Sequence, residues 1–309
     1  MPLGPPVLPE VNRTALTPPQ RSDYINSVRC MTSQPSLLAG DTYPGVKHRM
    51  DDFIAVHISY SLSKHASGIF LAWHRHYIWL WEQALRDECG YSGSLPPTSL
   101  SGDGTYDPND VGFDLNGETL PRGTGGGCVA SGPFKNLTLR MGPFPYELTS
   151  QPTLPDWAFA YNPRCFTRSL NSAVLTCFNS DAAVSALLAS PDVTAFQQKL
   201  DGFPNPEKGV AGLHTGGHLS LGEPMQDAFA GPQDPAFMLH HAMVDRLWAL
   251  WQEMDRGARL VQTNGTSTIF NAPRTPEVTL DTVVEFGGLG KSMRLGDLMD
   301  SSRYCYIYE

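Results

Sequence analysis

The pattern of apolar and polar positions predicts a series of helices joined by long loops. Two stretches, Phe70–Glu88 and Pro235–Met254, repeat apolar residues with the helical period. A Cys-Gly pair ends the first stretch, and Asp234 and Pro235 fit the N-cap and the first helical position of the second. Both stretches are therefore predicted as helices of the core.

Shorter periodic stretches predict further helices. The chain offers a helix start at Thr17 that leads through Tyr24–Arg29, a helix from Arg49 that carries His57, and short helices at Asp181–Ala189 and Val193–Leu200.

The remaining chain lacks helical periodicity. Residues 1–20 are rich in proline and predict an extended N-terminal arm. Residues 91–150 are dense in Gly, Pro, Ser and Asp and predict a long ordered excursion, which is usually functional or unusual. Residues after 258 alternate, so Tyr304–Tyr308 predicts a strand. With 29 Gly and 26 Pro among 309 residues, we expect one loop-rich domain over residues 1–309.

Charge and hydropathy exclude several partners. The net charge of -9 argues against nucleic acid and anionic membranes. No apolar run approaches the 18 residues or so of a transmembrane helix.

Cysteines and sequons suggest an oxidising compartment. The six cysteines form no CxxC pair, so three disulfides are expected, with fifteen pairings open and six reduced cytosolic thiols as the alternative. Sequons begin at Asn12, Asn136 and Asn264. The N-terminus has no basic-then-apolar signal, so we expect a secreted protein whose signal peptide is absent from this chain, or else a protein that is not secreted. The cysteines are Cys30, Cys89, Cys128, Cys165, Cys177 and Cys305.

Histidine is the residue type that carries the chemistry. All nine histidines except His48 fall in two clusters about 140 residues apart. The first cluster is His57, His65, His74 and His76, and the second is His214, His218, His240 and His241.

Each cluster can supply three imidazoles. His214 and His218 stand four residues apart and share one face of a helix, although the intervening Thr-Gly-Gly weakens that helix, and His241 comes from the next helix. His57 and His74 lie on successive predicted helices, with His65 in the loop between them.

This ligand pattern predicts a pair of metal ions. Imidazole-only ligation suits copper, zinc, iron or nickel, and three plus three ligands favour two ions facing each other. His48, His76 and His240 are expected not to be ligands; His76 is two residues past His74 and points to another helix face, and His240 is a neighbour of the site.

At these residues the chain resembles the tyrosinase and catechol oxidase family, the type-3 copper polyphenol oxidases, and in particular its short fungal secreted branch. The matching motifs are Phe70-Leu-Ala-Trp-His-Arg75, the run Asp234–Arg246 around the His-His doublet, and Tyr306-Ile-Tyr308. The resemblance spans roughly residues 43–255, and the C-terminal shielding domain of longer members is absent from this chain.

The resemblance implies a mainly α fold, in which a four-helix bundle holds two copper ions within long loops and a few short strands. It implies a monomer that uses O2 to oxidise small o-diphenols to o-quinones, with ortho-hydroxylation of monophenols as a further activity. No catalytic residue beyond the copper ligands is expected. The implied ligands are His57, His65 and His74 for site A, and His214, His218 and His241 for site B.

Hydrogen-bond acceptors should orient the ligands. We expect Asp245, one turn after His241, to be such an acceptor and to be tied to an arginine such as Arg75, with His240 beside the site.

Four positions near the ligands depart from the family pattern. Ser63 stands where many fungal members carry the cysteine of a thioether, and Thr215 stands where phenol-hydroxylating members often carry Asn. The acidic residue that holds a water near site B is not evident, because Asn205 and Glu207 stand nine and seven residues before His214. Thr215 and the missing acidic residue predict reduced monophenol activity.

The residues expected over site B and beside site A also differ. Ala228, with Phe229 beside it, should leave the pocket open to bulky phenols, and Met238 replaces an aromatic residue, a swap expected to be tolerated. An aromatic stretch that the family places after Ser94 is missing here, which removes aromatic core and can expose site A.

Three alternatives remain open. An oxygen carrier would use the same six histidines with the substrate path blocked, and a di-zinc hydrolase would need a bridging carboxylate that the sequence does not place. A catalytically impaired relative would follow from the missing segment after Ser94.

Overall fold

The computed structural model describes most of the chain. The described residues are 17–38, 40–93, 102–109, 112–115, 118–202, 211–304, 306 and 308. The sequence predictions for residues 1–16, for Asn205 and Glu207, for the segment after Ser94 and for Cys305 lie outside them.

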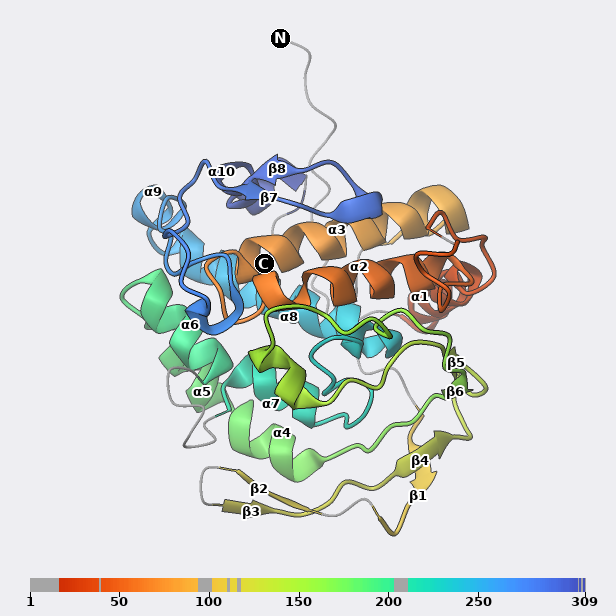
Figure 1. Cartoon of the computed structure of the whole chain (residues 1–309). Coiled ribbons are helices and arrows are strands. Elements are labelled where there is room, and N and C mark those ends of the chain that lie inside the picture. The colour runs from red at the N-terminus through yellow and green to blue at the C-terminus, as the bar shows by residue number, and fades with distance from the viewer. Residues whose placement is uncertain are drawn as a thin grey trace.

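Four helices form the centre of the molecule, and α2 and α3 run side by side in Figure 1. α8 packs against α3, and the short α7 packs against α8. The predicted mainly α fold with a helical core is confirmed. The four helices are α2 (Arg49–Lys64), α3 (Phe70–Cys89), α7 (Leu213–Leu219) and α8 (Ala236–Glu253).

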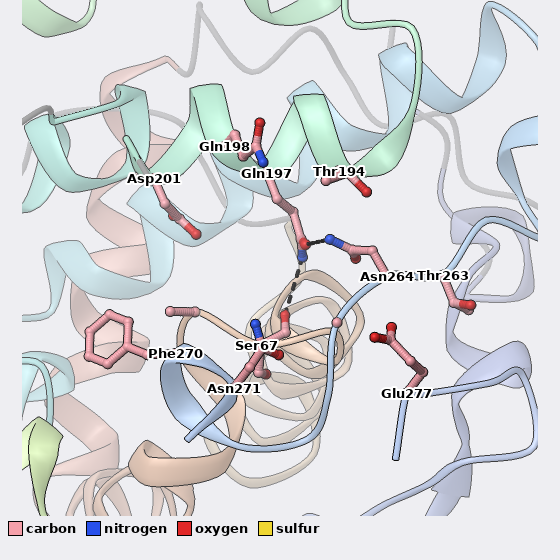
Figure 2. A pocket seen from close by; sticks show the side chains of 12 residues that line it. Ser67, Thr194, Gln197, Gln198, Asp201, Thr263, Asn264, Phe270, Asn271 and Glu277 are labelled. Carbon is pink, nitrogen blue, oxygen red and sulfur yellow. Dashed lines mark hydrogen bonds between the residues drawn. The ribbon is translucent and has the colours of Figure 1, made fainter. Parts of the chain in front are cut away.

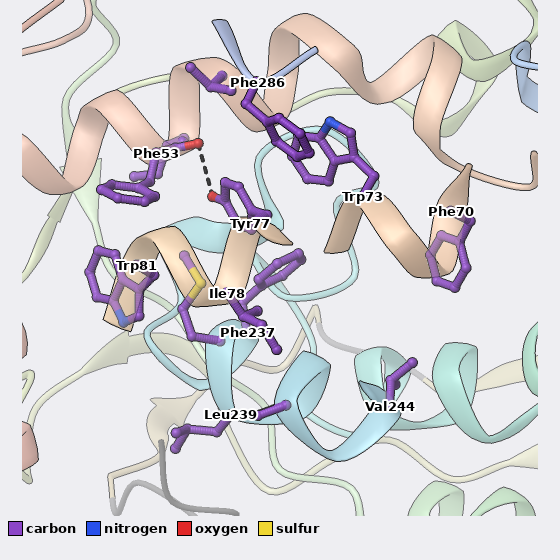
Figure 3. Close-up of a cluster of buried hydrophobic side chains, with 14 of the residues drawn as sticks. Phe53, Phe70, Trp73, Tyr77, Ile78, Trp81, Phe237, Leu239, Val244 and Phe286 are labelled. Carbon is purple, nitrogen blue, oxygen red and sulfur yellow. Dashed lines mark hydrogen bonds between the residues drawn. The ribbon is translucent and has the colours of Figure 1, made fainter. Parts of the chain in front are cut away.

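One face of α3 is a row of buried aromatic rings (Figure 3). Phe70, Trp73, Tyr77 and Trp81 follow one another at intervals of three and four residues, so they share a face of the helix. Phe237 of α8 packs in the same cluster. Burying each such ring contributes about 1.5–3 kcal/mol, so this row anchors α3 between its neighbours.

The described residues form six further helices outside this core. The predicted start at Thr17 is confirmed, because its side chain and that of Gln20 form a capping box. A disulfide between Cys30 and Cys89 ties the first helix to the end of α3. The six are α1 (Pro18–Met31), α4 (Ser172–Phe178), α5 (Asp181–Leu188), α6 (Val193–Asp201), α9 (Arg256–Arg259) and α10 (Leu295–Leu298).

Short antiparallel strand pairs fasten the loops between the helices. A second disulfide, Cys128–Cys165, holds two of these loops together. The pairs are β1 (Gly104–Tyr106) with β4 (Gly126–Val129), β2 (Phe113–Leu115) with β3 (Glu118–Leu120), β5 (Thr138–Leu139) with β6 (Arg164–Cys165), and β7 (Val283–Val284) with β8 (Met293–Arg294). The short 3-10 helices are Tyr146–Ser150, Gly231–Gln233, Ile269–Asn271, Gly287–Leu289 and Ser301–Tyr304.

Two local predictions are wrong. Pro235, not Asp234, occupies the N-cap position of α8. Asp234 still accepts a hydrogen bond from the Ala236 amide at 2.8 Å, and both of its carboxylate oxygens also bind the buried Arg168 guanidinium. The tail is not a strand in its described part: Tyr304 ends a 3-10 helix, and Tyr306 and Tyr308 direct their hydroxyls to Asp245. The described tyrosines of this tail are half-buried and belong to none of the strand pairs.

Two of the three expected disulfides are present. Cys30–Cys89 and Cys128–Cys165 bridge segments 59 and 37 residues apart, which contradicts the alternative of six reduced thiols. The third expected pair would need Cys305, which lies outside the described residues. None of the described helices has the length and apolar character needed to cross a membrane.

Candidate metal centre

The first histidine cluster assembles as predicted. His57 comes from α2, His65 directly follows that helix, and His74 comes from α3. One nitrogen of each ring lies within 4.8 Å of the others, and the ring centroids are 5.1–5.8 Å apart. A helix–loop–helix unit therefore brings three imidazoles to one point, which we call site A.

Main-chain carbonyls fix how the site A rings point. His57 Nδ1 donates to the Phe229 carbonyl at 2.6 Å, and His74 Nδ1 donates to the Phe70 carbonyl at 2.9 Å. The Nε2 atoms of His57 and His74 are buried and have no hydrogen-bond partner among the described residues. A buried acceptor without a partner costs about 1–3 kcal/mol, so these lone pairs fit a metal ion.

Site B is built on the α7 helix by His214 and His218. His214 Nδ1 donates to a carboxylate oxygen of Asp201 at 2.7 Å, and His218 Nδ1 donates to the Met225 carbonyl at 2.7 Å. Neither Nε2 atom then carries a proton in the neutral ring, yet the two lie 2.9 Å apart. Two lone pairs that face each other repel, and a cation between them would remove that repulsion.

Both histidines of the doublet reach site B, in different ways. One nitrogen of His240 lies within 4.8 Å of nitrogens of His214 and His218, but His240 Nε2 already donates to the His214 carbonyl at 3.0 Å. His241 has both ring nitrogens buried and without a partner in the described part of the chain. Its ring stacks on His74 of site A at 4.2 Å and lies 5.0 Å from His214, so His241 stands between the two sites.

The other two histidines lie elsewhere, as expected. His48 caps α2 and contacts Arg140, and His76 Nδ1 faces the Tyr304 hydroxyl at 3.2 Å. Burial lowers the pKa of His76 to about 4.

Burial disfavours the protonated form of five of the clustered imidazoles. It lowers the pKa of His57, His65 and His74 well below the usual value, with the charge of nearby Lys64 as the next cause. Burial also lowers the pKa of His218 and His241. Neutral imidazole is the form that binds a metal ion. Because burial favours this form, metal binding does not have to displace a proton from these rings.

Lys64 is a residue that the sequence analysis missed. The side chain is fully buried against α2 and α3: it donates to the His57 carbonyl and to Ser61 Oγ at 3.2 Å, and it lies over the Trp73 ring at 4.6 Å. A lysine at the end of a helix next to His65 looks like a surface residue in sequence, because its neighbours do not reveal the ring that covers it.

The expected tie between Arg75 and Asp245 is confirmed, but the role given to Asp245 is wrong. The two side chains are buried, and Arg75 Nε donates to Asp245 Oδ1 at 2.6 Å. The other oxygen of Asp245 accepts from Tyr306 and Tyr308, so no ligand histidine among the described residues donates to it. The acceptors of the histidine Nδ1 protons are instead three main-chain carbonyls and the Asp201 carboxylate. The sequence alone identifies none of these acceptors.

A cavity of about 200 Å³ opens onto both sites. Thr215 and Ala228 line it as expected, and the Thr215 hydroxyl donates to the Asp201 carbonyl at 2.9 Å. Phe229 differs from the expectation: its ring is buried against Phe144, and only its carbonyl serves the site. The remaining wall includes the apolar side chains of Phe70, Phe237, Ile269 and Phe270 and the polar side chains of Gln226 and Asp227.

Two of the three site A rings, those of His57 and His74, are buried, whereas His65 is half-buried. The side chains of His57 and His74 are 1% and 2% exposed. Trp73 and Phe237 pack beside them, with Phe237 4.9 Å from the His57 ring.

Comparison with known proteins agrees with this geometry. Residues 47–254, more than half of the chain, match the common central domain of tyrosinase. The chain belongs to the tyrosinase family. Tyrosinase P of Aspergillus terreus is 49% identical, with 93% of this chain and 88% of that protein covered. An N-acetyl-6-hydroxytryptophan oxidase of Emericella nidulans is 42% identical, with 96% and 90% covered.

A solved structure gives the same picture. A point mutant of the polyphenol oxidase from Thermothelomyces thermophila superimposes with a TM-score of 0.86 at 35% identity, covering 98% of this chain and 88% of that one. The family uses two copper ions with O2, and the residues of this chain fit that pair. The fit rests on nitrogens of His57, His74 and His241 that are buried without a hydrogen-bond partner among the described residues, and on the Nε2 atoms of His214 and His218, which face each other.

Proposed function

We propose that this family member oxidises catechols to o-quinones with O2. The observation that carries the proposal is the pair of histidine triads that open onto one mainly apolar cavity of about 200 Å³, a size and lining suited to a single aromatic ring. The copper pair, when bound, supplies the electron-accepting chemistry that passes two electrons and two protons from each catechol toward dioxygen, which two catechols reduce to water.

Six histidines are the proposed ligands, three at each site. His241 is preferred over His240 as the third ligand of site B. His240 Nε2 donates a hydrogen bond to a main-chain carbonyl, whereas neither ring nitrogen of His241 has a hydrogen-bond partner among the described residues. The proposed ligands are His57, His65 and His74 at site A, and His214, His218 and His241 at site B.

The surrounding residues orient the rings and exclude water. The carbonyls behind His57, His74 and His218 set the tautomer, and the Asp201 carboxylate does so for His214. The rings of Phe70 and Phe237 flank the cavity and remove water from the reacting face.

Catechols are proposed as far better substrates than monophenols. A monophenol must lose its hydroxyl proton to a neighbouring base before it can react, whereas a catechol already carries two exchangeable protons on adjacent oxygens. The Thr215 hydroxyl donates its proton to the Asp201 carbonyl, so it offers no strong base at this position. Small Ala228 leaves room for ring substituents.

Oxygen uptake tests the proposal. The copper-loaded protein should consume O2 with 4-tert-butylcatechol and much more slowly with 4-tert-butylphenol. Equal rates for the two would contradict the catechol preference, and no uptake with either would favour an oxygen carrier or an impaired relative. The di-zinc alternative is disfavoured because the two metal-type clusters of the described residues contain only histidine, without a bridging carboxylate.

Secretion as a monomeric glycoprotein is also part of the proposal. The two disulfides support an oxidising compartment. Asn136 is exposed and can accept a glycan, whereas the Asn264 amide nitrogen donates to Gln197 at 2.6 Å inside a pocket. Glycan release followed by peptide mass mapping should find a glycan at Asn136 and none at Asn264; the reverse would contradict the assignment.

A further inference from the structure

A second and larger cavity, of about 640 Å³, adjoins the cavity over the metal centre. Figure 2 shows that helix α6 forms one wall through Gln197 and Asp201, and that the segment around Asn264 and Phe270 forms another. Ala66, Asp201 and Phe270 line both cavities, so the two share a wall. Asp201 also binds His214 at 2.7 Å, which places this wall next to site B.

The lining of the larger cavity is polar but not basic. It is built mostly of amide and hydroxyl side chains and includes two acids, Asp201 and Glu277, whereas no Lys, Arg or His is among its described lining residues. Ser67 Oγ is buried there and has no hydrogen-bond partner within the described chain. Such an oxygen costs about 1–3 kcal/mol unless a ligand or water binds it. The polar lining residues are Ser67, Thr194, Gln197, Gln198, Thr263, Asn264 and Asn271.

The backbone is strained at Ala66 and Phe270 of the shared wall and at the neighbouring Asn271. Ala66, Phe270 and Asn271 have φ angles of +42°, +53° and +56°, which side-chain-bearing residues rarely adopt. The Phe270 amide donates to the Ala66 carbonyl at 3.2 Å, and the Asn271 side-chain oxygen accepts from the amide and the hydroxyl of Thr266, both at 2.8 Å. Each residue with such a backbone conformation costs about 1–3 kcal/mol, and it persists only where the surrounding structure fixes the backbone. Residues of this kind are common at ligand-binding sites.

We propose that this polar cavity is a subsite for the side arm of the substrate, an inference that rests on the proposed catechol oxidation. With the ring in the cavity over the metal centre, an arm of a few atoms passes the wall of Ala66 and Phe270 and enters the polar cavity. The amide and hydroxyl groups bind a neutral arm that carries an amide or hydroxyl, and Ser67 Oγ gains its missing partner.

The acidic lining of the larger cavity should exclude substrates with a negatively charged side arm. A carboxylate arm would approach Asp201 and Glu277 with no cation among the described lining residues to offset the repulsion. The preferred substrate class is therefore a catechol with a short uncharged polar arm, and a catechol with an acidic arm is a poor substrate.

Three catechols that differ only in the arm provide the test: 4-methylcatechol, dihydrocaffeic acid and the primary amide of that acid. The amide should have a kcat/KM about tenfold above that of 4-methylcatechol, through a lower KM, and the acid should fall below 4-methylcatechol; tenfold corresponds to one good polar contact. The kcat values should stay within a factor of about two, because the ring chemistry is the same.

Substitutions locate the effect. Ser67→Ala should lower the preference for the amide over 4-methylcatechol, and Glu277→Gln should raise the kcat/KM of the acid severalfold. Asp281→Asn is the matched control, because it removes the same charge from a side chain that is 85% exposed and outside both cavities, and it should change neither ratio.

The outcomes separate the two proposals. Copper-loaded protein that oxidises none of the three catechols contradicts the proposed function itself. Protein that oxidises all three with the same KM, or whose preferences survive Ser67→Ala and Glu277→Gln, contradicts the subsite and leaves the catechol oxidation intact.

Discussion

The Asp201 carboxylate orients His214, a proposed metal ligand on the neighbouring helix α7. It lies at the end of α6, is 7% exposed, and accepts a hydrogen bond from His214 Nδ1 at 2.7 Å. That bond keeps the His214 proton on Nδ1 and leaves Nε2 free for the metal. We predict that its removal weakens copper binding at site B and not at site A.

The size of the effect follows from the bond that each variant keeps. Asp201→Asn retains an acceptor but loses its charge, and a charged hydrogen bond contributes about 1.5–3 kcal/mol against about 0.5–1.5 for a neutral one. The difference of about 1 kcal/mol predicts a loss of about fivefold in site B copper affinity. Asp201→Ala removes the acceptor, and loss of such a contact typically costs about 10- to 100-fold in metal affinity.

A chelator competition on the metal-free protein measures both copper affinities. Asp192→Asn is the matched control, because it makes the same change at the other end of α6, where Asp192 caps the helix with a 2.8 Å bond to the Ala195 amide. That variant should bind both coppers normally. Folded Asp201→Ala protein that binds two coppers as tightly as the unmodified chain would refute the role given to this carboxylate.

The remaining predictions concern the doublet, the buried ion pair and pH. His241→Ala should reduce bound copper from two ions to one per chain, whereas His240→Ala should retain two; elemental analysis decides, and the opposite result would exchange their roles. Arg75→Met should lower the free energy of unfolding by about 3–5 kcal/mol in denaturant titrations, because it leaves the buried Asp245 carboxylate without its cation; a loss below about 1 kcal/mol would contradict that interpretation. Burial lowers the pKa of His76 from 6.5 to about 4, so the unfolded chain binds its proton first and stability should fall as pH drops from 6.5 to 4. His76→Phe should flatten that part of the pH profile of the metal-free protein, and an unchanged profile would count against it.

The long helices and the proximity of the histidines could be predicted from sequence. In α3 the apolar spacing of three and four residues predicts the aromatic face directly. The helical period also fixes the direction of His74 relative to that face. In α7 the four-residue interval puts His214 and His218 on one side despite two glycines.

Contacts made across the fold could not be predicted in this way. Asp201 reaches His214 because α6 and α7 pack together, and the carbonyls of Phe229 and Met225 belong to the main chain, so their residue types carry no signal. Asp245 shows the converse case: its interval from His241 suggests an acceptor, but Arg75 and two tyrosines of the tail occupy its oxygens.

The polar subsite was also hidden from sequence. Its residues come from α6, from the turn after α2 and from the segment around Asn264 and Phe270, which are far apart along the chain. Asn264 begins a glycosylation sequon, yet its amide points into that cavity. Only tertiary packing decides between these two uses of an asparagine.

The central claim is that two histidine triads together hold the copper pair that oxidises catechols. The most direct test is a titration of Cu(II) into the metal-free protein, with the rate of O2 uptake on 4-tert-butylcatechol measured after each addition. The account predicts a rate that rises to a plateau at two copper ions per chain and no rate with Zn(II). A plateau at one copper ion per chain, or no O2 uptake once two are bound, would contradict it.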